Sequence, residues 1–496
     1  MLMPPALTPS LAQGRLPALG DQISDAFGVG TERKLGDQIM REIRVDPDYI
    51  DDPVLLEYVE SLWSRLVGAA RARGDIEAEL DQRFAWEAFL VRDRSVNAFA
   101  LPGGYVGVHL GLISMTATRD ELASVLAHEM SHVTQRHIAR GMVNSKRTSF
   151  MGVAAIILGV LVASRSNRGD GANAVIAGGQ ALAVQGMLNF SRDMEREADR
   201  IGFAVMSAAG FAPGGMAAMF EKLDQSSRLN DSGGYPYLRS HPMSTERIGE
   251  ARARLGSAAP VAPVSVLAHS VAQARARVLM DTRAVSLRRL QSQSVDSHAP
   301  ASDRLVGAYA RALSATLLRD WAVADEAIAT AFGIVRGPGG DAAAERAVTL
   351  LVAESQLERG DVARANEALK PYMDTLGDSR PVLLLAARAA LAGKDRPALQ
   401  RCADELQTWA SLHPKDASVW LMLSRVWGQM DFRLRALRAE AESRIALGDY
   451  TGGIDRLRAG QRAARGPRTA DFIEASVIDA RLRDVERLKR QDERPE

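Results

Sequence analysis

The stretch "TRDELASVLAHEMSHVTQRHIAR", residues 118–140, decides how the N-terminal half of this chain folds. Its opening threonine and Glu121 have the spacing of a capping box, which predicts the start of a helix. Residues four apart on a helix lie one above the other, so His128 and His132 can offer two imidazole nitrogens to one ion. Glu129 can reach a water held by that ion. The pattern H-E-x-x-H is typical of zinc chemistry in which the metal acidifies a water and a carboxylate takes its proton.

A third metal ligand must come from another segment. The metzincin pattern needs Gly and His where this chain has Gln135 and Ile138, so that arrangement is excluded. In "SRDMEREADRIGF", residues 191–203, Glu195 and Asp199 are again four apart. We expect Glu195 to ligate the ion and Asp199 to accept a proton from a ligating imidazole, which fixes its tautomer. The alternative is a solvated charged helix.

Two further basic side chains are candidates for the same site. His241 lies in "LRSHPMSTERI". It can close over the zinc as a fourth ligand or donate to the oxyanion of a tetrahedral intermediate, and Arg247 can serve the same charge. The alternative is a loop that only begins the next helix. His137 is five residues past His132, about half a turn round from His128 on a continuous helix, and we interpret it as a surface or second-layer histidine.

The composition limits the class of protein. The chain has 496 residues, 46% apolar and 25% charged, which is ordinary for globular proteins and predicts two or three domains. The net charge of +1 gives no general nucleic-acid-binding surface. A single cysteine, Cys402, excludes an intrachain disulfide and a thiolate zinc site.

Residues 31–255 predict one mixed domain around the histidine pair. "FAWEAFLVRD" and "GYVGVHLGLI" read as strands joined through "SVNAFALPGG". Residues 148–191 hold two uncharged, apolar stretches that predict a helical hairpin packed on this domain. The first stretch has fewer residues than the roughly 20 that span a bilayer. A hairpin that contacts a membrane or gates substrate entry is the alternative.

Residues 1–30 form a leader of open assignment. "MLMPPALTPSLAQGRLPALGDQ" lacks the basic start and long apolar core of a complete signal peptide, although Ser10-Leu11-Ala12 resembles the end of one. The segment is therefore either an export signal without its front end or an ordinary flexible terminus.

The C-terminal part of the chain is nearly all helix-forming. Residues 256–302 are rich in Pro, Ser and Ala around one helical piece and predict a linker. In residues 303–496, similar turns recur at Gly360, Gly393, near Met430 and at Gly448. A period near 34 residues predicts a tetratricopeptide-like repeat domain, in which stacked units share a core. A plain helical bundle is the alternative. The whole chain is thus expected to be α+β and mostly helical, a zincin-like domain with a small sheet followed by an all-α domain.

The order of four motifs resembles a known family. "NAFALPGGYVGVHLGLI", "ELASVLAHEMSHVTQRH", "SRDMEREAD" and "SHPMSTERI" follow one another as in the HtpX-like zinc peptidases, relatives of the CAAX prenyl endopeptidases. The repeat half makes the chain similar to the periplasmic branch that acts in outer-membrane assembly. The resemblance is specific over residues 97–250 and weak beyond residue 300.

The resemblance implies one zinc ion held by His128, His132 and Glu195, with Glu129 as the catalytic base. It also implies that Asp199 supports a ligand from behind. His241 would lie on a loop near the zinc and hold the site closed until substrate arrives.

The stretch that contains Asn97 would supply an edge strand that receives substrate by strand addition, with Asn97 holding a main-chain group. These implications predict a periplasmic endopeptidase for unfolded or stalled polypeptides, whose repeats bind substrate or the outer-membrane assembly machinery. One rival is a chaperone or adaptor that works through its repeats with little proteolysis. A second rival is a peptidase anchored in a membrane by residues 148–191.

Overall fold

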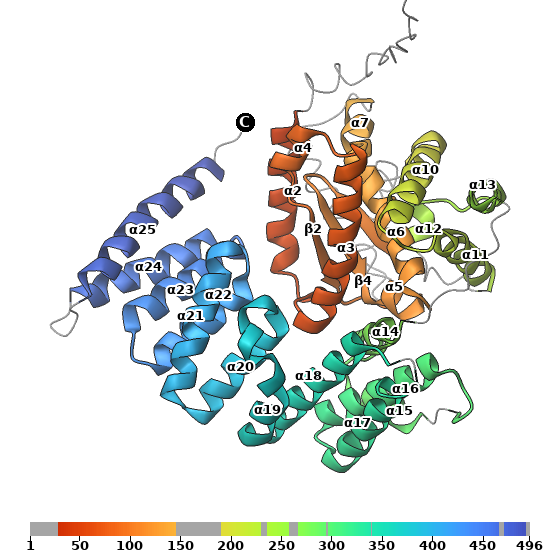
Figure 1. Ribbon diagram of the computed structural model, residues 1–496. Helices are drawn as coiled ribbons and strands as arrows, with labels where there is room; N and C mark the ends of the chain where they lie inside the picture. Colours follow the sequence, from red (N-terminus) through yellow and green to blue (C-terminus); the bar gives the residue numbers. More distant parts are fainter. Residues whose placement is uncertain are drawn as a thin grey trace, which may run out of the picture.

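The computed structural model describes residues 28–144, 190–229, 236–256, 266–293, 296–338, 340–465 and 471–492. The described chain is mostly helical with one four-stranded sheet, which confirms the expected α+β class. Figure 1 shows the sheet and its helices on one side and an arc of paired helices that curves away below them. The expected hairpin at 148–191, except for its last two residues, and nearly all of the leader lie outside the described residues. Within them, no helix is both long and apolar enough to cross a membrane.

The N-terminal half builds helices around a small mixed sheet. Its elements are α2 (Val29–Arg44), β1 (Tyr49–Ile50), α3 (Pro53–Arg73), α4 (Ala78–Arg83), β2 (Glu87–Val91), β3 (Ala98–Leu101), β4 (Tyr105–His109), α5 (Leu110–Met115), α6 (Arg119–Thr134), α7 (His137–Asn144), α10 (Arg192–Ala208), α11 (Gly214–Leu229), α12 (Tyr237–Ser240) and α13 (Thr245–Leu255). The expected strand "GYVGVHLGLI" is too long, because its second half forms α5. The expected connection before it contains β3.

The sheet has the order β1-β2-β4-β3, with β2 and β4 parallel and the other two pairs antiparallel. Every residue of the central strand β4 is buried. A sharp turn with positive φ at Gly103 and Gly104 reverses the chain between β3 and β4. A Cβ at Gly104 would lie 2.8 Å from the Phe84 Cβ, so this turn also needs glycine for space. The turn pairs β3 with β4, and the strand order leaves β3 at one edge of the sheet.

Hydrogen bonding shows which backbone groups of β3 face the free edge. The His109 N–H donates to the Asn97 carbonyl oxygen at 3.1 Å, and these two residues face each other in register. Bonded and non-bonded pairs alternate along an antiparallel ladder. Ala98 and Ala100 therefore direct their N–H and C=O groups away from β4, and no other described strand pairs with β3. Helix α6 packs along this strand.

The C-terminal half is an array of helices. They are α14 (Leu267–Leu279), α15 (Ala284–Ser292), α16 (Ala301–Leu318), α17 (Trp321–Val335), α18 (Ala342–Arg359), α19 (Val362–Leu369), η1 (Lys370–Asp378), α20 (Arg380–Gly393), α21 (Arg396–Leu412), α22 (Ala417–Gln429), α23 (Arg433–Ala446), α24 (Tyr450–Ala464) and α25 (Phe472–Asp492). Two of the recurring turns are a left-handed glycine, Gly360 or Gly448, followed by an aspartate that caps the next helix. The Gly-Asp signal thus marks a helix end and a helix start together.

The two halves are joined through α14 rather than by an extended tether. Residues 256–302, expected to be a linker, contain α14 and α15. Ala272 and Ala276 of α14 belong to the core of the N-terminal half, whereas Val271 and Val278 belong to the core that α14 shares with α15 to α18. One helix therefore serves as a wall of both cores.

Buried ion pairs fix the same junction. Arg275 of α14 binds both carboxylate oxygens of Asp52, at 2.6 and 2.7 Å, and both of Glu354, at 3.0 and 2.7 Å. Arg380 binds Asp51 and Asp416 in the same two-pronged way. These contacts clamp the start of α3 to helices α18, α20 and α22 of the array.

Candidate metal centre

Helix α6 carries the H-E-x-x-H motif through the middle of the N-terminal half. The Thr118 hydroxyl accepts from the Glu121 N–H at 3.2 Å, so the expected cap is present. From Asp120 to Thr134 every residue of α6 is buried. A helix that is buried on all sides needs neighbours on every face, and sheet, α3, α10 and α11 supply them.

Helix α10 brings the acidic pair to the histidines. The Ser191 hydroxyl caps it by accepting from the Met194 N–H. Ala198 is fully buried between the helices. At Gly202 a Cβ would lie 3.1 Å from the Ala127 carbonyl oxygen, closer than the helices tolerate without shifting. The small residues let α10 approach α6 closely, and Gly202 is a part of this contact that the sequence analysis missed.

Four side chains from three segments converge on one point. Nε2 of His132 lies 3.0 Å from Nε2 of His128, and both nitrogens lie 3.5 Å from a Glu195 oxygen. Nδ1 of His241 lies 3.2 Å from His128 Nε2 and 2.9 Å from Glu195 Oε1. The four donor atoms are all within 4.8 Å of one another. The structure thus brings together three expected ligands and the loop histidine.

The spacing and chemistry of these donors fit a zinc ion. Zinc bonds of about 2.0–2.1 Å in a tetrahedron place ligand atoms about 3.3 Å apart, and the separations here bracket that value. Burial lowers the pKa of His132 well below its usual range, and His128 lowers it further, so its ring is neutral and can offer a lone pair. Imidazole nitrogens with one carboxylate oxygen are a set that zinc accepts.

The negative charge of the carboxylates around His128 also favours binding of a cation. Burial by itself lowers the pKa of His128, but the carboxylates of Asp199 and Glu195 outweigh burial and raise it to about 10. A proton on His128 therefore partly balances the acidic residues in the metal-free protein. A metal ion would supply the same positive charge and leave the nitrogen free to bind.

Glu129 is buried beside the four donors without a partner. Its side chain has no exposed surface, and neither oxygen has a hydrogen-bond partner among the described residues. Burial raises its pKa, against the opposing effects of His241, His128 and the nearby backbone of Ala100 on β3. Its Oε1 lies 3.5 Å from His241 Nε2. A carboxylate with a raised pKa and free oxygens is suited to take a proton from water and return it.

Asp199 and Arg247 lie behind the donors. His128 Nδ1 is 2.9 Å from Asp199 Oδ1, as expected for a carboxylate that orients an imidazole. Arg247 binds both oxygens of Asp199, at 2.7 and 2.8 Å, and its Nη1 lies 2.9 Å from Glu195 Oε2. The guanidinium is thus engaged with carboxylates, so the expected contact of Arg247 with a substrate oxyanion is not favoured. It holds the two acidic side chains in place.

Two aromatic rings position His241. The Tyr237 ring stacks on it with centroids 4.6 Å apart, and Phe190 lies on another side at 5.5 Å. Tyr237 is itself tied to the sheet, because its N–H donates to the Val96 carbonyl oxygen. The loop histidine is therefore seated over the donors by packing as well as by polar contacts.

His137 and Asn97 differ in how they relate to the donors. His137 is fully buried, so of its two expected placements the surface one is wrong and the second-layer one is right. Burial lowers its pKa to about 4, and its ring is neutral. Asn97 precedes β3, and its buried Oδ1 has no partner among the described residues. It lies at the start of the edge strand.

Comparison with known proteins shows what the N-terminal half is similar to. Residues 58–255 match the model described as "Peptidase family M48". This stretch contains the whole donor group and the edge strand. The match confirms the resemblance to the metal-dependent peptidases that the four motifs indicate.

Individual relatives match over different lengths. The "Putative beta-barrel assembly-enhancing protease" of Vibrio cholerae is 37% identical over 54% of this chain and 53% of its own length, so this match spans about half of each. The "Beta-barrel assembly-enhancing protease" of Escherichia coli is 28% identical over 96% of this chain and 92% of its own length. The "Mitochondrial metalloendopeptidase OMA1" of Saccharomyces cerevisiae is 31% identical over 38% of this chain. The similarity to the Escherichia coli protein includes the helical array.

Proposed function

We propose, on the premise that residues 58–255 form a peptidase family M48 domain, that this chain is a zinc endopeptidase for unfolded or stalled polypeptides. A metal-dependent peptidase acts on polypeptides, and zinc is our assignment of the metal. The observation that carries the proposal is the partnerless carboxylate of Glu129 beside four converging metal donors.

Each side chain of the centre then has a task. His128, His132 and Glu195 hold the ion. When bound, the ion polarises the scissile carbonyl and makes the attacking water more acidic. Glu129 takes the proton from that water and delivers it to the leaving amine. Asp199 fixes the tautomer of His128 from behind.

The free edge of β3 supports binding of an extended substrate. Ala98 and Ala100 offer N–H and C=O groups there, and α6 runs alongside the strand. A substrate that adds as a strand would be held by its main chain, in the mode used by other edge-binding proteins. Asn97 at the start of the edge could bind a further main-chain group through its partnerless Oδ1. Main-chain recognition suits substrates that are unfolded.

His241 is the side chain that we assign to closing the site. It lies against Glu195 and Glu129 at once, on the side where a water must stand. Replacing it with alanine is expected to speed the cleavage of a short unstructured peptide and to weaken zinc binding slightly. A slower reaction at saturating zinc would favour the alternative, in which His241 donates to the oxyanion.

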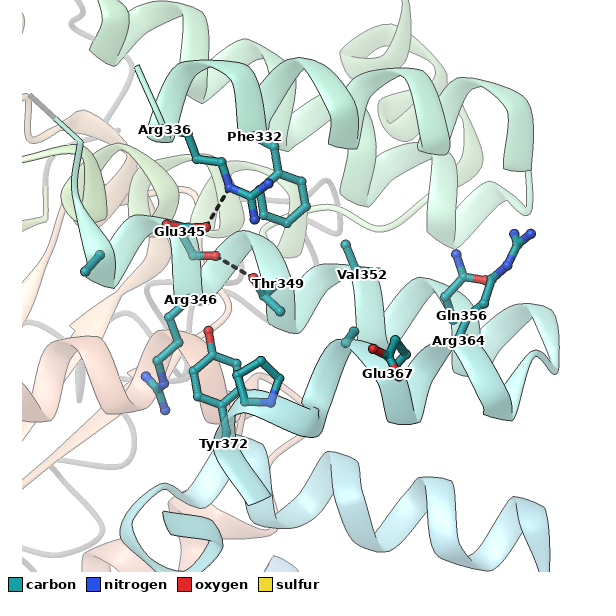
Figure 2. Close-up of a pocket in the computed structure, with 13 residues that line it drawn as sticks. Phe332, Arg336, Glu345, Arg346, Thr349, Val352, Gln356, Arg364, Glu367 and Tyr372 are labelled. Atoms are coloured by element: carbon teal, nitrogen blue, oxygen red, sulfur yellow. Dashed lines mark hydrogen bonds and ion pairs between the residues drawn. The ribbon is translucent and has the colours of Figure 1, made fainter. Parts of the chain in front are cut away.

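The helical array supports a second binding role. A hollow of about 830 Å³ lies between α17, α18 and α19. Figure 2 shows three of its lining residues, Thr349, Val352 and Gln356, on the central helix. Gln356 is buried, and its Oε1 has no partner among the described residues. Gln356 lines the hollow, and a buried acceptor without a partner marks a place where a further polar group can be accommodated. We assign this hollow to substrate or partner binding.

The cellular setting follows from the relatives. Proteins named for enhancing β-barrel assembly match both halves of the chain. We infer that this chain acts in outer-membrane protein quality control in the periplasm and that its array binds the assembly machinery or its clients. The rival role, a chaperone with little proteolysis, is favoured by the hollow in the array but leaves Glu129 without a task.

Metal analysis tests the proposal. Purified protein should contain one zinc per chain, and Glu195→Ala should lose most of it. Casein cleavage should stop after chelation and return when zinc is added. A chain that holds no zinc, or that cleaves casein equally well after chelation, would remove the peptidase assignment.

A further inference from the structure

His137 is a buried histidine beside the donor group that the proposed reaction does not use. It has no exposed surface and begins helix α7. Its Nδ1 lies 2.9 Å from Nδ1 of His132, and its Nε2 lies 3.0 Å from Oε2 of Glu197. Arg140 also binds that oxygen, at 2.9 Å. His137 therefore bridges a proposed metal ligand and a carboxylate near the surface.

A break in the helix makes this contact possible. On a continuous helix the two histidines, five residues apart, would project in different directions. Helix α6 instead ends at Thr134, and Arg136 takes a left-handed conformation with a φ of 51°. That conformation is costly for a residue with a Cβ, so it needs support from its surroundings. The buried carboxylate of Glu32 provides it by accepting from Arg136 Nε at 2.9 Å.

Proton placement along the bridge has one consistent solution. Nε2 of His132 faces the other donors, so it must carry a lone pair to bind a metal. The His132 proton is then on Nδ1 and donates to Nδ1 of His137. His137 must accept there and carry its own proton on Nε2, which donates to Glu197. When Nε2 of His132 binds a metal, this placement of protons gives each of the other ring nitrogens of His132 and His137 a hydrogen-bond partner.

We propose that His137 is a positioning residue that presents His132 to the metal, an inference that rests on the proposed function. It accepts the His132 Nδ1–H, locks the tautomer and ring angle of that ligand, and is itself held by Glu197. Groups behind a ligating imidazole typically contribute 10–100-fold to metal affinity. His128 contacts the carboxylate of Asp199 directly. His132 is connected to the carboxylate of Glu197 through the imidazole of His137.

The carboxylates behind His128 and His132 differ in exposure, so one of them can be substituted with little effect on folding. Asp199, behind His128, has no exposed surface, whereas the Glu197 side chain is 30% exposed. Glu197→Gln therefore changes the group that holds His137, at a partly exposed site that tolerates substitution. His137→Leu removes the acceptor and keeps an apolar side chain in the buried space. His137→Gln keeps an acceptor oxygen.

The experiment measures the zinc dissociation constant of full-length protein by competition with a chelator, and the visible absorption of the cobalt-loaded protein. His137→Leu should weaken zinc binding about 10–100-fold. His137→Gln should recover part of this loss, and Glu197→Gln should weaken binding less than His137→Leu. The cobalt spectrum should change in His137→Leu, because His132 is no longer held at one angle.

Three results decide the inference. If His137 only fills space, His137→Leu lowers the unfolding temperature of the metal-free protein without changing the zinc constant, and the proposal is overturned. If His137→Leu does not fold, wild-type zinc constants in both glutamine variants overturn it equally. A wild-type protein that binds no zinc removes the proposed function itself, which is a distinct failure.

Discussion

Two groups of buried charge lie in this molecule, and they differ in how completely their members are paired. At the junction of the halves, all five N–H groups of Arg275 have acceptors, on Asp52, Glu354 and Tyr309. At the candidate metal centre, neither oxygen of Glu129 accepts a hydrogen bond from a side chain among the described residues. Both groups are buried, so exposure does not separate them. A paired group holds the structure together, and an unpaired one marks where a further partner has to come.

Glu129→Gln should produce the largest effect and confine it to the metal centre. Loss of the base should slow casein cleavage about 10²–10⁴-fold while zinc content stays unchanged. Folding stability should not fall, because the amide fills the same space and keeps an acceptor oxygen for the backbone of Ala100. The exposed Glu246→Gln is the matched control. Equal rates in wild type and Glu129→Gln would leave the helical array as the only functional part.

Arg275→Met should do the reverse at the junction. It leaves Asp52 and Glu354 buried without their cation, which costs about 3–5 kcal/mol of unfolding free energy. Zinc content and turnover per folded molecule should be preserved. Urea unfolding measures the loss, and Arg388→Met, which breaks a pair exposed by about two-fifths on each side, should cost about 0–1 kcal/mol. Similar losses in both variants would show that the buried ion pairs of Arg275 stabilise the protein no more than the exposed pair of Arg388.

The pH dependence of stability should distinguish the metal-free protein from the zinc-bound one. The folded pKa of His128 is raised to about 10 from a usual value near 6.5. Its stabilising effect is therefore complete below about pH 6.5 and is lost as the pH rises towards about 10. Zinc displaces this proton, so the decline should disappear when metal is bound. Thermal unfolding with and without zinc across this range is the measurement, and parallel curves would refute the assignment.

Gln356→Leu should have the smallest effect. Removing a buried acceptor that has no partner should change the unfolding free energy by no more than about 1 kcal/mol. If the hollow binds unfolded substrate, KM for casein should rise while kcat and zinc content remain constant. Gln400→Leu, on an exposed face of α21, is the control. An unchanged KM would exclude the hollow from substrate binding.

The sequence was sufficient for the parts of the centre that depend on local periodicity. The H-E-x-x-H spacing placed His128 and His132 on one helical face, and the same spacing placed Glu195 beside Asp199. The structure brings these residues together, while their roles remain proposals.

Features that depend on distant or strained residues could not be predicted in the same way. The contact of His137 with His132 requires a left-handed Arg136, and arginine gives no sign of that conformation. The pair of Arg275 and Asp52 joins positions 223 residues apart. Arg247 binds the buried carboxylates of Asp199 and Glu195, contacts that its charge alone did not predict.

Helix α14 gives the chain a fixed internal geometry. Because its two faces belong to two different cores, this helix fixes the orientation of the two halves relative to each other. If the array binds substrate as proposed, the distance and angle between that binding site and the edge strand are fixed by this shared helix. The position of the cleaved bond would then depend on where the substrate is bound on the array.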